Sequence, residues 1–156
     1  MCAEKLLIIN SGGENRKLPA YAITGSIFTP IPVYRWKTGQ KINQCIFDLQ
    51  TDFCSNIIEK TNNKQNLIIS AGDVILNCKK YPKEIPDADI VIISTWIDSS
   101  IAIHHGVLFA RNNSQNILDF SIQKPTAEKI ESLLSTHVFM LDTGCWILSD
   151  KAVEIL

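Results

Sequence analysis

The residues best suited to chemistry follow four aliphatic residues near the N-terminus. They are Ser11, Gly12 and Gly13, with the cations Arg16 and Lys17 close behind. Because glycine has no Cβ, backbone amides at a Gly-Gly pair can approach an anionic ligand closely. A guanidinium fork and an ammonium point charge can both neutralise phosphate oxygens. The pattern predicts a phosphate-binding loop, and its alternative is an ordinary strand-to-loop turn with two solvated cations.

A second candidate follows the apolar run Leu67–Ile69, which we expect to be a buried strand. The residues just beyond that run are Gly72 and Asp73. A carboxylate supplies the hard oxygen that Mg²⁺ prefers. Asp73 is therefore a candidate ligand for a hard cation, with a plain turn as the alternative.

Three weaker candidates occur later in the chain. His105 and Gly106 precede a predicted strand, and Gly144 either lets the backbone approach a ligand or marks a strand bulge. His104 and His105 are expected on extended backbone, where neighbouring side chains point to opposite faces, so they are not expected to share a metal.

The composition indicates an ordinary globular chain. It has 156 residues, 46% of them hydrophobic, and a net charge of −1, which gives no basic excess for a nucleic-acid partner. Its apolar runs are too short to cross a bilayer, and the N-terminus lacks a signal-peptide pattern. The five cysteines are scattered without a CxxC pair, which favours reduced thiols in a cytoplasmic protein.

Alternating strands and helices position these residues. Strands are expected at Leu6–Ile9, Leu67–Ile69, Asp89–Ser94, Val107–Ala110, Ile117–Gln123 and within His137–Leu148. Helices are expected after an Asn43 cap, after a Thr126 cap with Ile130, Leu133 and Leu134 inward, and from Ser149–Asp150. The proline-containing Ala20–Val33 is expected to be extended. This order predicts an open α/β sheet with its functional crevice at the carboxyl ends of the strands.

Several fragments, in order along the chain, resemble the sugar-1-phosphate nucleotidyltransferases. The likeness is greatest to L-fucose-1-phosphate guanylyltransferases, especially that domain of bifunctional L-fucokinase/GDP-fucose pyrophosphorylases. The fragments are GGENRKLPAYAITGSIFTPIPVYRW, DLQ, SAGDV, W-x-D, HHGV, LDF…QKP and LSDKAVEIL. Each fragment alone is weak, but the ordered set covers nearly the whole chain.

The resemblance implies a Rossmann-like, three-layer α/β/α nucleotide-diphospho-sugar transferase fold with a mixed, mostly parallel sheet. Residues 1–156 would be the N-terminal part of a single nucleotidyltransferase domain that is incomplete at its C-terminus, since the last helix stops abruptly. The implied reaction is Mg²⁺-dependent transfer from GTP to L-fucose 1-phosphate, giving GDP-fucose and pyrophosphate. A fused C-terminal kinase domain is a further implication.

The resemblance also implies roles for the candidate residues. Ser11, Gly12, Gly13 and Gly72 would bind the nucleotide. Arg16, Lys17 and Lys124 would act on the reacting phosphates, with Lys124 near the sugar phosphate. The sugar would contact His105, Gly106 and Gly144, and Asp73 would hold Mg²⁺. A solvated hairpin lysine is the alternative for Lys124.

Two positions depart from the family pattern. Lys17 stands where the family has its signature arginine, and Ser26 stands where it has a lysine. Lysine lacks the bidentate fork, and serine cannot offset phosphate charge. These departures favour a second hypothesis, a non-catalytic nucleotide or sugar-phosphate binding module. A third is a transferase for another hexose 1-phosphate or another nucleotide.

Overall fold

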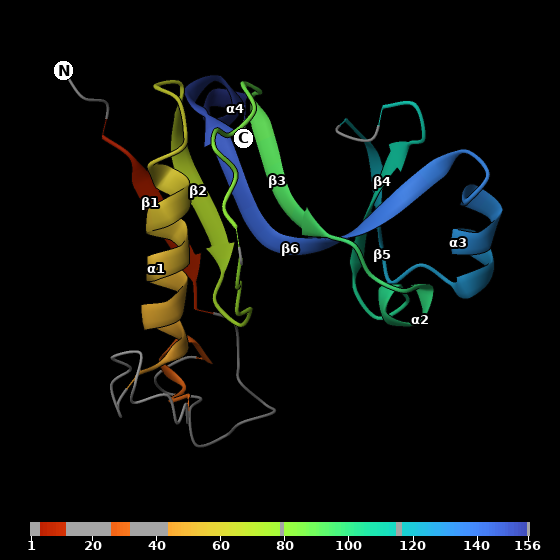
Figure 1. The fold of residues 1–156 in the computed structure, drawn as a ribbon, viewed down its shortest axis with the longest axis horizontal. Helices are drawn as coiled ribbons and strands as arrows, with labels where there is room; N and C mark the ends of the chain where they lie inside the picture. Colours follow the sequence, from red (N-terminus) through yellow and green to blue (C-terminus); the bar gives the residue numbers. More distant parts are fainter. Residues whose placement is uncertain (1–3, 12–25, 32–43, 79, 115–116, 156) are drawn as a thin grey trace. The chain divides into compact units, whose positions relative to one another are not determined.

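The computed structural model describes residues 4–11, 26–31, 44–78, 80–114 and 117–155 (Figure 1). These residues form two compact units. The first unit is Met1–Val91 with Gly144–Leu156, and the second is Ile92–Thr143. Each unit is described by itself below.

The first unit is built on a strand–helix–strand arrangement. Strand β1 (Leu6–Asn10) pairs in parallel with β2 (Gln65–Ala71), and helix α1 (Ile46–Ile58) lies between them in sequence. In Figure 1, α1 runs alongside both strands. Parallel strands need a crossover of a dozen or more residues, which the chain from Ser11 to Lys64 supplies. The two strands therefore end at the same edge of the sheet.

Helix α1 is held by one apolar stripe. Phe53, Cys54 and Ile57 are buried at helical spacing, and Ile68 of β2 is buried with them. Burying each large aliphatic or aromatic side chain contributes about 1.5–3 kcal/mol. The predicted helix is confirmed, and its stripe also contains a polar residue, Gln50, which is 1% exposed.

The helix begins later than its sequence signals indicate. Its N-cap is Cys45, whose backbone N–H donates to the Asp48 carboxylate at 2.8 Å. This carboxylate satisfies a free donor of the first turn. The prediction of Asn43 as the cap was therefore wrong, and Asn43 itself lies outside the described residues. The extended prediction for Ala20–Val33 also fails locally, because Ser26–Phe28 form a 3₁₀ turn, η2.

Among the described residues the sheet has six strands, in the order β1-β2-β6-β4-β5 with β3 paired to β6. Strand β3 is Ile90–Thr95, and the 13-residue β6 is His137–Ser149. The pairings of β6 with β2, of β4 with β5 and of β4 with β6 are all antiparallel. The prediction of a mostly parallel sheet was wrong. Strands β5 and β6 are joined through a helix, Ala127–Leu133, but they lie on either side of β4 and so do not pair with each other. Helix α4 (Asp150–Ile155) follows β6 as predicted, with the Ser149 hydroxyl accepting from the Ala152 N–H at 3.2 Å.

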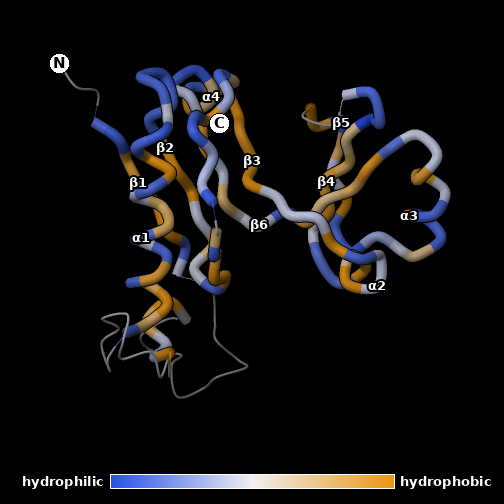
Figure 2. Tube along the Cα trace, in the orientation of Figure 1, coloured by the Kyte–Doolittle hydropathy of each residue, from blue (hydrophilic) through white to orange (hydrophobic). Residues whose placement is uncertain are grey.

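The second unit contains a hairpin packed on two short helices. Strands β4 (Gly106–Arg111) and β5 (Leu118–Gln123) form the predicted hairpin. The buried cluster comprises Ala102, Val107, Phe109 and Ile130, and the hydrophobic colouring of β4 in Figure 2 marks its centre. Helix α2 (Ser99–Ala102) has only four residues and was not predicted, because one turn carries no measurable periodicity.

Helix α3 (Ala127–Leu133) begins at the predicted cap, but one residue that was predicted to face inward is exposed. The Thr126 side chain caps it as predicted, accepting from the Lys129 N–H at 3.3 Å. Ile130 is fully buried, whereas Leu134, predicted to face inward, is 51% exposed. Leu134 is the C-cap residue and lies beyond the turn that packs on the core.

The second unit also contains an ion-pair cluster that makes its stability pH-dependent. Asp119 accepts from Arg111 Nε at 2.9 Å and lies 3.0 Å from His137 Nε2. The hydrogen bond from Arg111, and then that from His137, lowers the pKa of Asp119 below its ordinary value. A carboxyl group with a lowered folded-state pKa stabilises the protein above its unfolded-state pKa, near 4, and loses that contribution as the pH falls further.

We therefore expect Asp119→Asn to remove a pH-dependent part of the stability of the second unit. Calorimetry should show that the wild type unfolds at a higher temperature than the variant at pH 6, and that this difference in unfolding temperature decreases toward pH 3. Asp52→Asn, an exposed carboxylate change on α1, should keep the wild-type pH dependence. A difference in unfolding temperature between wild type and Asp119→Asn that stays constant with pH would contradict this role of Asp119.

Two findings bear on the class of protein. In the part of the chain that the structure describes, no helix is long and apolar enough to cross a membrane. The described cysteines Cys45, Cys54, Cys78 and Cys145 are free thiols.

Candidate functional site

The ends of β1 and β2 meet at Gly72. A Cβ placed on Gly72 would lie 2.1 Å from the Asn10 carbonyl oxygen and 3.2 Å from the Ser11 Cα. Real side chains do not approach backbone atoms so closely, so this position requires glycine. The close approach brings two candidate nucleotide-binding residues, Ser11 and Gly72, together at one edge of the sheet. We refer to Ala71–Val74 as the Gly72 turn.

A buried side chain of α1 holds the Gly72 turn on both sides. Gln50 Nε2 donates to the Ala71 carbonyl at 2.6 Å and also to the Val74 carbonyl. Its Oε1 accepts from the Ser70 hydroxyl at 2.9 Å. Gln50 and Ser70 are each 1% exposed. Both donors and the acceptor of the amide are thus used, as buried polar groups require.

Two thiols continue this buried network beneath the turn. Cys54 and Cys145 are both 0% exposed. Hydrogen bonding to Cys145, and to a lesser degree to Ser70, lowers the pKa of the Cys54 thiol against the opposing effect of burial. Both cysteines fill the core between α1 and the sheet.

Gly144 of β6 lies against the same turn. Its φ is +70°, and a Cβ there would lie 2.7 Å from the Ala71 Cβ. A left-handed φ and this close contact both favour glycine. The structure therefore brings together three candidate residues of the first unit: Ser11, Gly72 and Gly144. The position of Gly144 on a strand fits the bulge interpretation as well as a ligand contact.

Asp73 is exposed on the Gly72 turn. No three His, Cys, Asp or Glu side chains among the described residues converge as a metal site would require. Magnesium in nucleotide enzymes is commonly held by one or two carboxylates together with the substrate phosphates. A single exposed carboxylate on a fixed turn fits a metal that arrives with its nucleotide.

The remaining candidates lie in the second unit, at the end of the hairpin where β4 starts and β5 ends. The Lys124 N–H donates to the His105 carbonyl at 2.8 Å. Gly106 faces Gln123, whose Nε2 would lie 2.7 Å from a Cβ at that glycine. Hence Lys124, His105 and Gly106 form one cluster. His104 and His105 lie in the turn after α2, so the expectation that they sit on extended backbone was wrong.

Lys124 has an unusual backbone. Its φ is +48°, the one left-handed non-glycine position among the described residues. Such a conformation costs about 1–3 kcal/mol, and strained residues cluster at functional sites. The buried Pro125 follows it, and the exposed Lys124 side chain starts from this constrained position.

Four predicted site residues cannot be placed. Gly12, Gly13, Arg16 and Lys17 lie outside the described residues, as does the side chain of Ser26. Their roles stay predictions.

Sequence reasoning missed Gln50 as part of the site. It occupies the buried stripe of α1 three, four and seven residues before Phe53, Cys54 and Ile57. A polar residue within an apolar stripe needs buried hydrogen-bond partners. That signal was available from the sequence.

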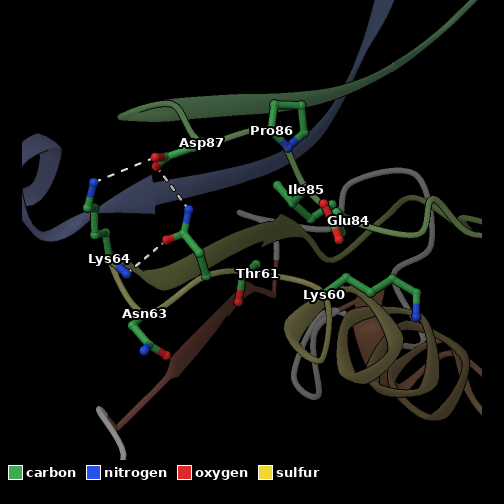
Figure 3. Close-up of a pocket in the computed structure, with 9 residues that line it drawn as sticks. Lys60, Thr61, Asn63, Lys64, Glu84, Ile85, Pro86 and Asp87 are labelled. Atoms are coloured by element: carbon green, nitrogen blue, oxygen red, sulfur yellow. Dashed lines mark hydrogen bonds and ion pairs between the residues drawn. The ribbon is translucent and has the colours of Figure 1, made fainter.

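A hollow in the described structure lies away from the Gly72 turn (Figure 3). It measures about 800 Å³ and is open to solvent. Residues 60–64 and 84–87 line it, and Lys64 pairs with Asp87 at 3.6 Å. It lies at the start of β2, whereas the Gly72 turn follows the end of that strand, about 20 Å along seven extended residues. The hollow is therefore separate from the candidate site.

The sequence of the chain is similar to that of one family of known proteins. The model of the "Fucose pyrophosphorylase domain" matches residues 1–156. The chain is 42% identical over 153 residues to L-fucokinase/L-fucose-1-P guanylyltransferase of Bacteroides fragilis, covering 98% of this chain and 16% of that protein. It is 24% identical over 152 residues to bifunctional fucokinase/GDP-fucose pyrophosphorylase of Arabidopsis thaliana, covering 91% of this chain and 14% of that protein. The chain thus spans about a sixth of the length of these relatives.

Proposed function

Because this chain belongs to the fucose pyrophosphorylase domain family, we propose that the natural protein containing it transfers a guanylyl group from GTP to L-fucose 1-phosphate. A phosphate oxygen of the sugar attacks the α-phosphorus of GTP, and the bond from that phosphorus to the bridging oxygen breaks. GDP-fucose forms and pyrophosphate leaves. Catalysis of such a step consists mainly of positioning and charge stabilisation.

The observation that carries this proposal is the meeting of β1 and β2 at Gly72. Ser11 leads into the Gly-Gly pair, and Asp73 follows Gly72 on the adjacent strand end. Amides and a carboxylate at one sheet edge are what a magnesium-bound triphosphate requires. In this proposal Gly12 and Gly13 contact the phosphates, and Asp73 holds Mg²⁺, which would neutralise charge on the phosphate oxygens.

The cations have separate roles in the proposal. Arg16 and Lys17 neutralise the departing pyrophosphate. Lys124 contacts the sugar phosphate, and the strained backbone at φ +48° limits where its side chain can reach. His105 and Gly106, which cluster with Lys124, contact the sugar, as does Gly144.

The complete domain is proposed to have a Rossmann-like nucleotide-diphospho-sugar transferase fold. The parallel β1–α1–β2 arrangement supports this fold class. The antiparallel pairing of β2 with β6 differs from the parallel pairing of a doubly wound sheet. The names of both relatives include a fucokinase activity. We extend the proposal to a fused kinase in the natural protein.

Steady-state pyrophosphate release by the natural protein tests the reaction. We expect turnover with GTP and L-fucose 1-phosphate, and a higher kcat/KM for GTP than for ATP, UTP or CTP in competition. GTP binding without pyrophosphate release would favour the alternative, a non-catalytic binding module, which Lys17 and Ser26 support. Preference for another nucleotide or another hexose 1-phosphate would favour a transferase of different specificity.

A further inference from the structure

We propose that Gln50 is a positioning residue, which fixes the Gly72 turn and thereby the place of the Asp73 carboxylate. The inference rests on the proposed function for its catalytic consequence. Its structural part, that one side chain sets the turn, depends only on the contacts of the first unit.

The contacts of Gln50 enclose the turn. Its Nε2 donates to the carbonyls of Ala71 and Val74, which flank Gly72 and Asp73. Ala71 is the last residue of the ladder of β2 with β1, which ends at the Asn10–Ala71 pair, and Val74 lies beyond that ladder. Since Gln50 is 1% exposed, water cannot easily replace these bonds. The Gln50 amide therefore donates hydrogen bonds to backbone carbonyls of this turn, as a neighbouring strand does within the sheet.

A second element also contacts the turn. The Asn10 carbonyl abuts Gly72, so backbone from β1 and the Gln50 amide from α1 both contact the turn. Ser70 fixes the amide orientation by donating to Oε1 at 2.9 Å. With Oε1 committed as an acceptor, Nε2 must face the two carbonyls. Asp73 therefore projects from a backbone that is fixed before any ligand binds, which is the preorganisation that a metal ligand needs.

The chain supplies a matched control at the other end of β2. Gln65 is also 1% exposed, and its Nε2 donates to the carbonyls of Pro86 and Ala88 at 2.8 and 3.1 Å. Gln65 thus makes the same kind of double contact to a different loop. Removing either amide removes two hydrogen bonds to loop carbonyls, but only Gln50 contacts the Gly72 turn.

The test compares Gln50→Leu with Gln65→Leu in the natural protein. Without metal or nucleotide, hydrogen–deuterium exchange of amides 72–75 should accelerate about 10-fold or more in Gln50→Leu, because the turn loses the two hydrogen bonds from the buried Gln50 amide. In Gln65→Leu, the acceleration should instead fall at residues 85–89. Unchanged exchange at 72–75 in Gln50→Leu would overturn the inference, whatever the protein catalyses.

Kinetics then separate positioning from general loss of structure. Gln50→Leu should lower kcat/KM for Mg-GTP about 10- to 100-fold, as loss of a partner to a metal ligand does, with a raised KM. Gln65→Leu should keep the wild-type KM, since a smaller folded fraction lowers only the apparent kcat. Equal KM values in both variants would overturn the positioning role. If the wild type released no pyrophosphate, the proposed function would fail while the exchange experiment still decided the role of Gln50.

Gln50→Glu provides a conservative variant should the leucine variant fold poorly. A buried carboxyl has a raised pKa, and only its protonated form can donate to a carbonyl. The ratio of variant to wild-type kcat/KM should therefore rise as the pH falls from 8 to 6. A ratio that does not change with pH would count against hydrogen-bond donation by this side chain.

Discussion

Replacing Gly72 by alanine is expected to separate the ends of β1 and β2 and to reduce kcat/KM for GTP about 100-fold. The added Cβ would lie 2.1 Å from the Asn10 carbonyl oxygen and 3.0 Å from its carbon. Backbone cannot rotate away as a side chain can, so the strands must shift by roughly 1 Å. A misplacement of that size costs on the order of 10²-fold in rate, and overpacking costs about 1–3 kcal/mol of stability.

Hydrogen exchange and kinetics of the natural protein check this expectation. Exchange should accelerate in peptides that cover both Leu6–Ser11 and Gln65–Val74, since both strand ends move. For exchange, Gly106→Ala is the control, because its Cβ would meet the far end of the Gln123 side chain, which can move aside. If Gly72→Ala had the exchange rates and the kcat/KM of the wild type, the close approach of β1 to the turn would not be required for function.

Replacing Asp73 by asparagine is the second change with a large expected effect. We expect kcat for pyrophosphate release to fall on the order of 10²-fold or more, because a neutral amide cannot match a carboxylate as a magnesium ligand. The side chain is exposed and keeps its shape, so stability should change little. Raising the Mg²⁺ concentration should restore part of the activity.

Asp87→Asn is the matched control for Asp73→Asn. Asp87 is also exposed on a loop beside β2, but its carboxylate pairs with Lys64 at the other end of the strand. We expect turnover within about twofold of wild type, since exposed ion pairs contribute little. Full activity of Asp73→Asn across Mg²⁺ concentrations would exclude the carboxylate as a metal ligand.

The parts of the fold that could be predicted are those with strong local patterns. Apolar runs identified β1 and β2, and Thr126 identified the start of α3. The cap of α1 could not be found this way, because Asn43 has the better intrinsic preference and Asp48 reaches back to Cys45 instead. Strand direction is not encoded within a strand, so the antiparallel pairing of β6 depended on connections that sequence patterns do not reveal.

The candidate site was predictable to a similar degree. Gly72 and Asp73 could be placed at a strand end because they follow the apolar run of β2 closely. The proximity of Ser11 to Gly72 follows from the parallel pairing of β2 with β1. The strain at Lys124 could not be foreseen, because a lysine before proline carries no sequence signal for φ > 0. Gln50 was overlooked because helical periodicity was read from the apolar residues alone.

Gln50 of α1 and Gln65 of β2, which hold the loops beyond the two ends of β2, make these contacts insensitive to acid. Carboxamides do not ionise, so the bonds from Gln50 and Gln65 to their loops persist from mildly acidic to alkaline solution. Carboxylate anchors would weaken on acidification, whereas these two amide anchors have no proton to gain. In the proposed reaction, the second ionisation of the sugar phosphate, with a pKa near 6, is one source of pH dependence near neutrality, and the two glutamine anchors add none.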